Sequence, residues 1–385
     1  MKTDDSSADQ ECALNGKLVN GSCQCDPQWS GVACGQLRLL PTPRNSGFEG
    51  GGDGRGQRNS SAVASTWGGS VIQDPTTKEY VMFVSRMSHH CGLSAWKTNS
   101  EIVQAVATSP TGPYVQRGSA VLGRFAHNPS IHASKSGAIF LFHIGCGKNS
   151  TQPITDCVNG TTNSPDLDRE KLLRSSTASA AGGCDGPHYT TGMSAPSLAG
   201  PWTQFKKEIT LKSSRAGNTA HITNPCVLAE RNSGLLRWIY RQPAQDWPSI
   251  PSNQTSERIG IATADSWSSA ELQDLTPHAP LFPFALEDAF IWQNRRGEYH
   301  ALTHKGAGVS GHLYSRDGLS WAIGGTSPYN TTLAFTDGTS LEVGKRARPQ
   351  LLLSAAGDPL LLTTGCGLRG DGDFVFTSVQ PIAQS

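Results

Sequence analysis

The chain has 385 residues, of which 32 are Lys or Arg and 31 are Asp or Glu, so its formal net charge is +1. A nearly neutral chain has no global electric field that would favour nucleic acid or an anionic membrane as a partner. No apolar run approaches the roughly 18 residues that a membrane span needs, and the first residues contain no apolar signal-peptide region. We therefore expect a soluble chain without a membrane span, from which any secretion signal has been removed.

Residues 1–36 contain a cluster of cysteines in a polar, turn-rich sequence: Cys12, Cys23, Cys25 and Cys34. This density is typical of small disulfide-stapled modules in an oxidising compartment. The alternative is a zinc knuckle, but the segment has no histidine, and secretion disfavours thiolate–zinc ligation. The pattern predicts a small disulfide-rich module.

The chain contains several Asn-X-Ser/Thr acceptors for N-glycosylation. They are Asn20, Asn59, Asn149, Asn159, Asn253 and Asn330. Together with the cysteine cluster, they predict a secreted glycoprotein that is extracellular or at the cell surface.

Residues 37–60 are rich in glycine from residue 47 onward. The stretch lacks both a preceding strand and the Gly-Lys-Ser/Thr ending of a phosphate loop. It therefore predicts a flexible linker.

From residue 61 to residue 385 a phrase repeats: polar residues, often a proline, an apolar strand, a turn and a second apolar strand. The copies are anchored at Gly69, Pro129, Pro225, Ala289 and Pro349. This spacing is that of large blades in a β-propeller. The sequence predicts an all-β fold, a five-bladed β-propeller preceded by the small module.

The second repeat is longer than the others because of a polar insertion between Gly147 and Pro187. Such a segment predicts a surface loop of the kind that shapes a binding site. The sequence does not select the pairing of the cysteines in the repeats, which are Cys91, Cys146, Cys157, Cys184, Cys226 and Cys366.

The openings of the repeats are unusually polar, and in a propeller the innermost strands bring them to one mouth. The predicted substrate-binding residues are Trp67, His127, Asn128, Asn224 and Arg348, and the candidate catalytic residues are Glu287 and Asp288. An aromatic surface with hydrogen-bonding groups and carboxylates suits an oligo- or polysaccharide. Two roles stay open for Arg348: clamping a uronate or sulfate, or bracing neighbouring blades through backbone carbonyls.

Histidines also recur near the blade ends, at His127, His221, His300 and His304. The spacing of His300 and His304 suits a metal site on a helix, but here it falls on a strand and its following turn. We therefore expect no metal and no cofactor. Asp74 is expected to cap a hairpin turn, and His89 and His90 are expected to be structural.

Two sequence patterns carry a resemblance to a known family. The tails that end at Tyr114 and Trp202 read Ser-Pro-x-Gly-Pro-aromatic or nearly so, and Ser315–Trp321 reads Ser-x-Asp-Gly-x-x-Trp. With the strand openings, they resemble the propellers of glycoside hydrolase family 43 and, more distantly, family 32. Separately, Cys23–Cys34 resembles the C-terminal half of an EGF-like module, which implies the pairs Cys12–Cys23 and Cys25–Cys34.

The family resemblance implies a catalytic set that this chain matches only in part. In family 43, an aspartate base opens blade one, an aspartate that tunes the pKa of the acid opens blade three, and a glutamate acid opens blade four. These positions fall on Gly68, Asn224 and Glu287. Adjacent residues on a strand point to opposite faces, so Glu287 and Asp288 are not expected to face the same substrate.

Three functional hypotheses follow. The first is a secreted glycoside hydrolase with an incomplete catalytic set, Glu287 as its acid and no assigned base. The second is a catalytically inactive carbohydrate-binding or structural glycoprotein of an extracellular matrix or surface coat. The third is a polysaccharide lyase with His127 as base and with Asn128 and Arg348 neutralising a uronate. In each case the EGF-like module is a candidate site for a protein partner.

Overall fold

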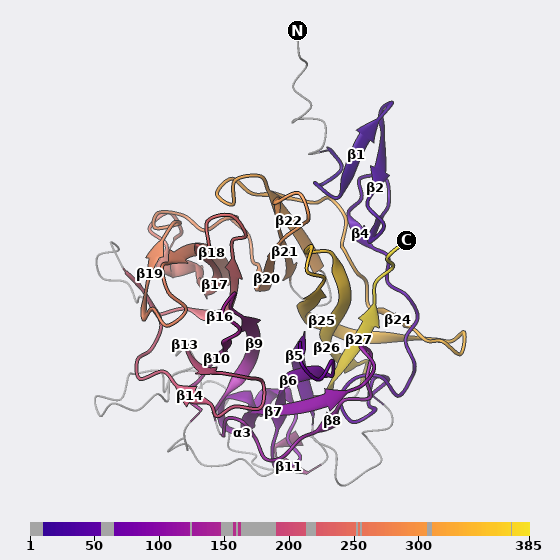
Figure 1. The fold of residues 1–385 in the computed structure, drawn as a ribbon, viewed down its shortest axis with the longest axis vertical. Helices are drawn as coiled ribbons and strands as arrows, with labels where there is room; N and C mark the ends of the chain where they lie inside the picture. Colours follow the sequence, from indigo (N-terminus) through magenta and orange to yellow (C-terminus); the bar gives the residue numbers. More distant parts are fainter. Residues whose placement is uncertain are drawn as a thin grey trace.

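The structure is a computed structural model of the chain. It describes residues 11–54, 65–123, 125–147, 157–158, 161–162, 190–212, 221–251, 253–254, 256–305, 310–370 and 372–385. The fold is all-β, with five blades arranged around a central axis (Figure 1). This confirms the predicted propeller.

Each blade is a sheet in which the strand that opens the sequence repeat lies nearest the axis. Blade one consists of β5 (Thr66–Gln73), β6 (Tyr80–Met87), β7 (Ser100–Ala107) and β8 (Val115–Gln116). Blade two consists of β9 (His127–Ala133), β10 (Ile139–Ile144), β13 (Thr190–Ala195) and β14 (Thr203–Gln204). Blade three consists of β16 (Thr223–Ala229), β17 (Leu236–Pro243), β18 (Glu257–Ala264) and β19 (Glu271–Asp274), with β15 (Thr210–Lys212) parallel to β19 at its edge.

Blade four consists of β20 (Glu287–Gln293), β21 (Tyr299–His304), β22 (Ser310–Ser315) and β23 (Ala322–Ile323). Blade five consists of β25 (Ser340–Leu353), β26 (Pro359–Leu368) and β27 (Val375–Pro381), with β24 (Thr332–Ala334) paired to the N-terminal part of β25. Blade five closes the propeller against blade one, where Thr377 Oγ1 donates to the carbonyl of Gly68 at 2.7 Å. Short additional elements are η1 (Leu93–Ala95), α3 (Trp96–Asn99), β11 (Cys157–Val158), β12 (Thr161–Thr162) and η2 (Ala244–Asp246).

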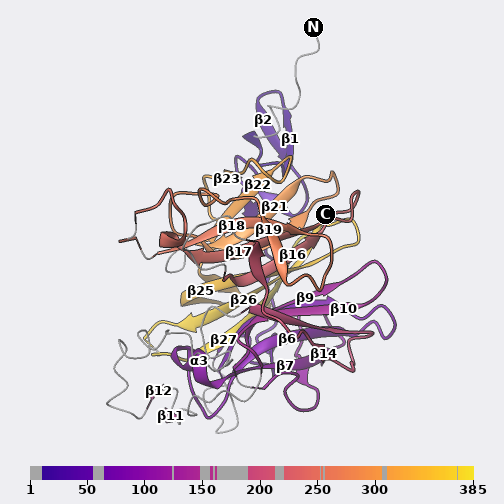
Figure 2. The ribbon, with the colours of Figure 1, turned by 90° about the vertical axis from the view of Figure 1, so that its left-hand side faces the viewer.

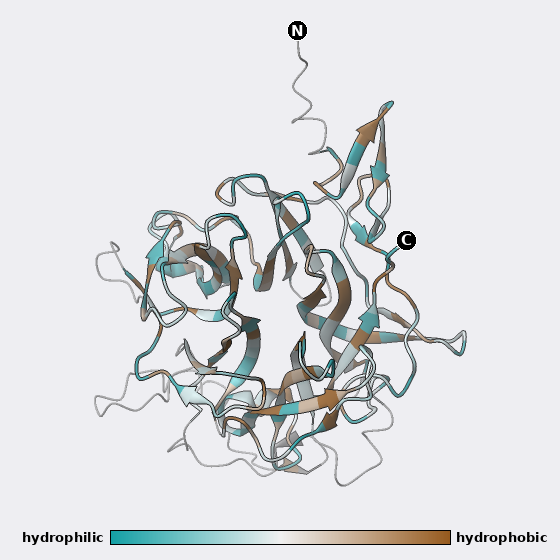
Figure 3. Cartoon of the chain, viewed as in Figure 1, coloured by the Kyte–Doolittle hydropathy of each residue, from teal (hydrophilic) through white to brown (hydrophobic). Residues whose placement is uncertain are grey.

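The inner strands are buried because neighbouring blades cover both of their faces. Apolar colours concentrate on the blade strands and polar colours on the connecting loops (Figure 3). Two aromatic residues that end repeat tails, Trp202 and Trp267, pack between neighbouring blades. Trp202 of blade two packs edge-on against Phe83 of blade one at 5.5 Å, and Trp267 of blade three stacks on Phe140 of blade two at 4.9 Å.

The N-terminal module stands at one end of the propeller, above blade four (Figure 2). It contains β1 (Gly16–Val19), β2 (Ser22–Cys25), β3 (Trp29–Ser30) and β4 (Gln36–Leu37). Disulfides join Cys12 to Cys23 and Cys25 to Cys34. A module this small has little core of its own, so the disulfides supply much of its stability.

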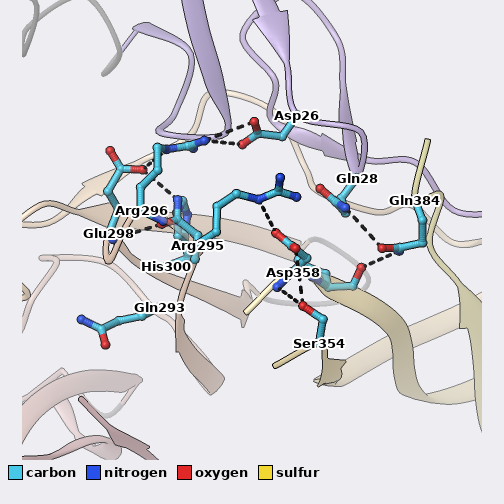
Figure 4. Close-up of polar contacts among 12 residues, drawn as sticks. Asp26, Gln28, Gln293, Arg295, Arg296, Glu298, His300, Ser354, Asp358 and Gln384 are labelled. Carbon is cyan, nitrogen blue, oxygen red and sulfur yellow. Dashed lines mark hydrogen bonds and ion pairs between the residues drawn. The ribbon is translucent and has the colours of Figure 1, made fainter. Parts of the chain in front are cut away.

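Specific contacts dock this module on blades four and five. Trp29 lies against the imidazole of His312, with ring centroids 4.7 Å apart. Arg296 of blade four pairs with Asp26 at 2.9 Å, and Gln28 donates to Gln384 beside blade five (Figure 4). One side of the module is therefore covered by the propeller.

The segment from residue 38 to residue 54, predicted to be part of a flexible linker, instead packs on the propeller. The amide of Thr42 donates to the carbonyl of Ala334 at 3.0 Å, and Tyr114 and Gly47 pair through their backbones. Phe48 is buried against blade one. The sequence signal failed because glycine here permits close contact with neighbouring strands rather than chain mobility.

Candidate functional site

Every inner strand has an irregularity near its start. In each blade two consecutive residues oppose a single residue of the second strand, which is the pattern of a β-bulge. The first bulged residue has a positive φ in all five blades: Gly68 (67°), Asn128 (56°), Asn224 (48°), Asp288 (58°) and Arg348 (53°). We call these five residues the axial cluster.

Hydrogen bonds link four members of the axial cluster around the propeller axis. Asn128 Nδ2 donates to Asn224 Oδ1 at 2.8 Å, and Asn224 Nδ2 donates to Asp288 Oδ1 at 2.7 Å. Arg348 completes the circuit: Nη1 contacts Asp288 Oδ1 at 3.4 Å and Nη2 donates to the carbonyl of Asn128 at 3.1 Å. The residues that open the repeats are thus coupled to one another.

The fifth member, Gly68, makes room for Arg348. A β-carbon at position 68 would lie 2.8 Å from Arg348 Cγ. Arg348 itself is 1% exposed. Of the two roles predicted for Arg348, the structure therefore shows bracing through a backbone carbonyl and an ion pair with Asp288, and its side chain does not line the cavity described next.

A cavity of about 150 Å³ lies on the axial cluster. It is lined by Trp67, Leu93, Trp96, His127, Asn128, Ile144, Asn224, Arg241, Glu287, Asp288, His304 and Lys345. The structure thus brings together six of the seven residues predicted for the site. Glu287 and Asp288 both line it, contrary to the expectation that they face apart, because the bulge between Glu287 and Phe290 interrupts the strand alternation.

Sequence reasoning missed Arg241, Lys345 and Trp96, and it singled out His304 only as one of the histidines near the blade ends and not as a partner of Glu287. The positions of Arg241 and His304 follow a common rule. A signal for these two exists in the repeat itself, because the end of each second strand lies opposite the start of the first. Thr223 pairs with Arg241 and Glu287 pairs with His304. Comparing the second strands as well as the first would have found them.

Trp96 belongs to the connection between β6 and β7, which forms one wall of the cavity. Trp96 lies 5.2 Å from His127 and 5.6 Å from Phe125, measured between ring centroids. A disulfide between Cys91 and Cys157 ties this connection to the insertion of blade two, and the amide of Leu93 donates to the carbonyl of Asp373. No repeat pattern marks this wall, because it lies between the second and third strands of blade one and not in the repeated strand openings.

Glu287 is held as an anion by its neighbours. Arg241 Nη1 lies 2.8 Å from Glu287 Oε2, and His304 Nδ1 lies 3.3 Å from Glu287 Oε1. Burial opposes ionisation, but the contact with His304 and the charge of Arg241 outweigh it and lower the pKa of Glu287 to about 2. A general acid needs a pKa near the working pH, so these neighbours disfavour the acid role predicted for Glu287.

Two other carboxyl groups near Arg241, those of Asp288 and Glu257, have raised pKa values, whereas that of Glu287 is lowered. Burial and the negative charge of Glu287 raise the pKa of Asp288, against the opposing charge of Arg348. Glu257 lies 3.5 Å from Arg241 Nε. Burial raises the pKa of Glu257, although Arg241 opposes the shift. Arg241 therefore contacts two carboxyl groups, Glu257 and Glu287, whose pKa values are shifted in opposite directions.

His127 is a neutral hydrogen-bonding group. Burial lowers its pKa well below the usual value, and the charges of Arg348, Arg241 and Lys345 add to this effect. Ser100 Oγ donates to the carbonyl of Ala126 at 2.8 Å, so it accepts from His127 Nδ1, also at 2.8 Å. This arrangement leaves His127 Nε2 as an acceptor.

His127 and His304 line the cavity, whereas the other histidines singled out in the sequence do not. His89 and His90 are exposed, and His221 pairs with Glu208 at 2.6 Å. His300 is stacked on His312 near the start of β21, whereas the cavity residue His304 is the last residue of that strand. Within the described ranges, no group of three or more His, Cys, Asp or Glu side chains is placed to hold a metal ion.

Several further predictions concern single residues. Asp74 caps its hairpin turn as predicted, accepting from the amides of Thr76 and Thr77. Cys226 and Cys366 are free and buried, and Cys146 is disulfide-bonded. Of the glycosylation acceptors, Asn20, Asn253 and Asn330 are exposed, whereas Asn59, Asn149 and Asn159 lie outside the described residues, as does Cys184.

A larger cavity of about 350 Å³ lies at the outer edges of blades two and three. Its lining is Gln204, Phe205, Lys206, Lys207, Ile209, Ser268 and Ala270. It contains neither a carboxylate nor a histidine, so the smaller axial cavity is the better candidate for chemistry. In the part of the chain that the structure describes, none of the helices has the length and apolar character of a membrane span.

No family model and no curated protein matches the sequence. Solved structures with the same fold include a family 117 glycoside hydrolase of the marine bacterium Zobellia galactanivorans, with 14% identity, a TM-score of 0.54, and 94% of this chain and 92% of that chain covered. A thermostable family 43 glycoside hydrolase has 11% identity and a TM-score of 0.50, with 86% and 97% covered. A protein of unknown function from Dyadobacter fermentans has 11% identity and a TM-score of 0.50, with 83% and 95% covered.

These likenesses define the class of the fold: the chain has the five-bladed propeller that occurs in glycoside hydrolases. At such low identity they establish the architecture alone, and the function has to be argued from the cavity.

Proposed function

We propose that this chain is a carbohydrate-binding protein that holds one sugar residue in its axial cavity and does not hydrolyse glycosidic bonds by the two-carboxylate route. The observation that carries the proposal is the packing of Arg348 against Gly68 and its ion pair with Asp288. Where the family 43 resemblance implies an aspartate base, this chain has a glycine whose β-carbon space is filled. Hydrolysis of the usual kind needs two carboxyl groups flanking the bond.

The chemistry of the cavity supports a sugar as ligand. Trp67 and Trp96 supply apolar surface for a sugar ring, and the remaining lining supplies donors and acceptors. Glu287 and His127 are acceptors, whereas Arg241 and Lys345 are donors. A sugar residue needs both kinds, because each of its hydroxyl groups donates and accepts.

The state of Glu287 supports binding rather than acid catalysis. An ionised carboxylate paired with Arg241 accepts hydrogen bonds from sugar hydroxyls but has no proton to give to a leaving group. Glu287 is therefore proposed as a ligand-orienting residue.

The test combines binding and product analysis. The purified chain is titrated with a panel of mono- and oligosaccharides by calorimetry, and the same mixtures are analysed for new reducing ends. We expect saturable binding without products, and weaker binding for Glu287→Gln. Glu271→Gln, on the exposed outer strand β19, is the matched control and should bind normally. Release of reducing ends by the wild type, but not by Glu287→Gln, would contradict the proposal.

A hydrolase remains the second candidate, because Glu287 and Asp288 share one cavity and their pKa values move in opposite directions. Such divergence is typical of acid and base pairs. In that case the lowered pKa of Glu287 suits a base or nucleophile and the raised pKa of Asp288 suits the acid. Turnover should then vanish in Glu287→Gln, and turnover that survives would exclude Glu287 from the catalytic pair. A lyase is not proposed, because Arg348, its neutralising group, lies outside the cavity.

We further propose that the protein is secreted and N-glycosylated, and that residues 1–36 form a truncated EGF-like module. The disulfides and the exposed acceptors Asn20, Asn253 and Asn330 support this. Expression in a eukaryotic secretory cell should give medium-borne protein whose mass falls on enzymatic removal of N-glycans. Retention of the unmodified chain inside the cell would overturn this proposal.

A further inference from the structure

Two lysines lie in or directly beside the axial cavity. Lys345 lines the cavity, and its Nζ lies 4.7 Å from the centroid of the Trp67 ring. Lys97 Nζ lies 5.5 Å from the ring of Trp96, which also lines the cavity. Among the described residues, neither ammonium group forms an ion pair with a carboxylate.

The carboxylates of the cavity, by contrast, are already matched by arginines. Glu287 is paired with Arg241 at 2.8 Å, and Asp288 is paired with Arg348 at 3.4 Å. Glu257, outside the cavity lining, also contacts Arg241. The two lysines therefore add positive charge that the carboxylates of the cavity do not offset through any ion pair.

The positive charges also act on one another. Burial lowers the pKa of Lys97, and the charge of Arg241 lowers it further. Lys345, Arg241 and Arg348 together oppose protonation of His127. An anion bound here would offset the mutual repulsion of these positively charged side chains. The site is partly buried, so charge interactions in it are stronger than in water.

The two lysines also have a geometry that suits a sugar acid. Each ammonium group lies over a tryptophan, and Trp67 and Trp96 belong to one apolar cluster. A sugar ring that contacts the tryptophans where they line the cavity would bring a charged substituent within reach of the ammonium groups. Both sides of the ligand, the apolar ring face and the anion, then have a partner.

We propose that the sugar bound in the axial cavity is anionic, carrying a carboxylate or a sulfate ester that is recognised by Lys345 with support from Lys97. This inference rests on the proposed carbohydrate-binding function and names the class of its ligand. Lys345 is the primary contact because it lines the cavity itself.

The experiment measures how tightly the full chain binds charged and neutral forms of the same sugar. Galacturonic acid, galactose 6-sulfate and galactose are titrated by calorimetry, as are the corresponding glucose derivatives. The variants are Lys345→Gln and Lys97→Gln, and the control is Lys17→Gln on the exposed edge of β1. Circular dichroism confirms that each variant is folded.

We expect at least one acidic sugar to bind about tenfold more tightly than its neutral parent, which corresponds to about 1.4 kcal/mol. Lys345→Gln should remove most of this preference, because it should weaken binding of the acidic sugar more than binding of its neutral parent, and raised salt should act in the same direction. A preference for the uronate or for the sulfate identifies which anion is read. Equal binding of neutral and acidic sugars, or an unchanged preference in Lys345→Gln, overturns the inference while the binding function stands. No binding of any sugar overturns both.

Discussion

The side chain of Arg348 occupies the space next to the α-carbon of Gly68, so that a β-carbon at position 68 would lie 2.8 Å from Arg348 Cγ. The two residues come from the first and last blades, which meet where the propeller closes. Because Arg348 also pairs with Asp288, the glycine, the arginine and the aspartate are linked. A change at any of them should be felt by the others.

Gly68→Ala should destabilise the protein more than the same change at Gly118. Both glycines have a positive φ, 67° and 71°, so both substitutions carry a backbone cost of about 1–2 kcal/mol. Position 118 has no atom within 4 Å of the added β-carbon, so only Gly68→Ala also collides with Arg348. We expect an additional loss of about 1–3 kcal/mol, measured by denaturant unfolding of both variants. Equal losses of unfolding free energy in the two variants would show that the close contact with Arg348 does not affect stability.

Glu287 should make the stability of the protein depend on pH in the acid range. Its pKa is lowered to about 2 from a usual value of 4.5. The folded state therefore binds its proton more weakly than the unfolded chain, and the stabilisation is present above about pH 4.5 and is lost as the pH falls toward 2. The difference in unfolding free energy between wild type and Glu287→Gln should shrink over that range.

The control for the pH dependence is Glu271→Gln, whose exposed carboxylate forms no ion pair within the described structure. Its unfolding free energy should follow the wild-type pH profile. A Glu287→Gln profile that runs parallel to the wild type from neutral pH down to the acid limit would mean that Arg241 and His304 do not stabilise the ionised carboxylate.

Trp29→Ala should detach the N-terminal module from blade four. Trp29 is 4% exposed and packs on His312, and truncating a buried tryptophan typically costs about 3–5 kcal/mol. Limited proteolysis should then cut the chain near residue 36 faster than in wild type. Val32→Ala is the control on the same module, because Val32 is 97% exposed and its loss should change stability by less than about 0.5 kcal/mol.

The repeat predicted the scaffold well because its apolar part recurs in every blade, and the strand openings of Asn128, Asn224 and Asp288 do converge on the axis. It did not predict the bulges, because the inner strands are buried on both faces and lack the apolar–polar alternation that an extra residue would shift. Without the bulge, the shared cavity of Glu287 and Asp288 could not be foreseen.

The rest of the site escaped prediction for a different physical reason. Arg241 and His304 lie at the ends of second strands, whose residues were not aligned with each other. Trp96 lies in the connection between β6 and β7, outside the repeated strand openings. The role of Arg348 depended on a positive φ and on empty space at Gly68, and both are properties of the folded chain rather than of residue type.

Asn224→Asp, the change toward the aspartate that the family 43 resemblance implies for blade three, should destabilise this protein rather than restore activity. Asn224 Nδ2 donates to Asp288 Oδ1 at 2.7 Å, so an aspartate would lose a hydrogen bond to a charged group, of about 1.5–3 kcal/mol, and would place two buried carboxylates together. Such repulsion raises the pKa of the pair, so the loss of unfolding free energy should be largest near neutral pH and should decrease as the pH falls and a proton is shared.

Asn224→Ser removes the donor without adding a charge and serves as the control, with a loss that should not depend on pH in this way. The unfolding free energy of both variants is measured at pH 7 and pH 5. Equal losses at the two pH values for Asn224→Asp would mean that the carboxylate of Asp288 does not repel a carboxylate at position 224.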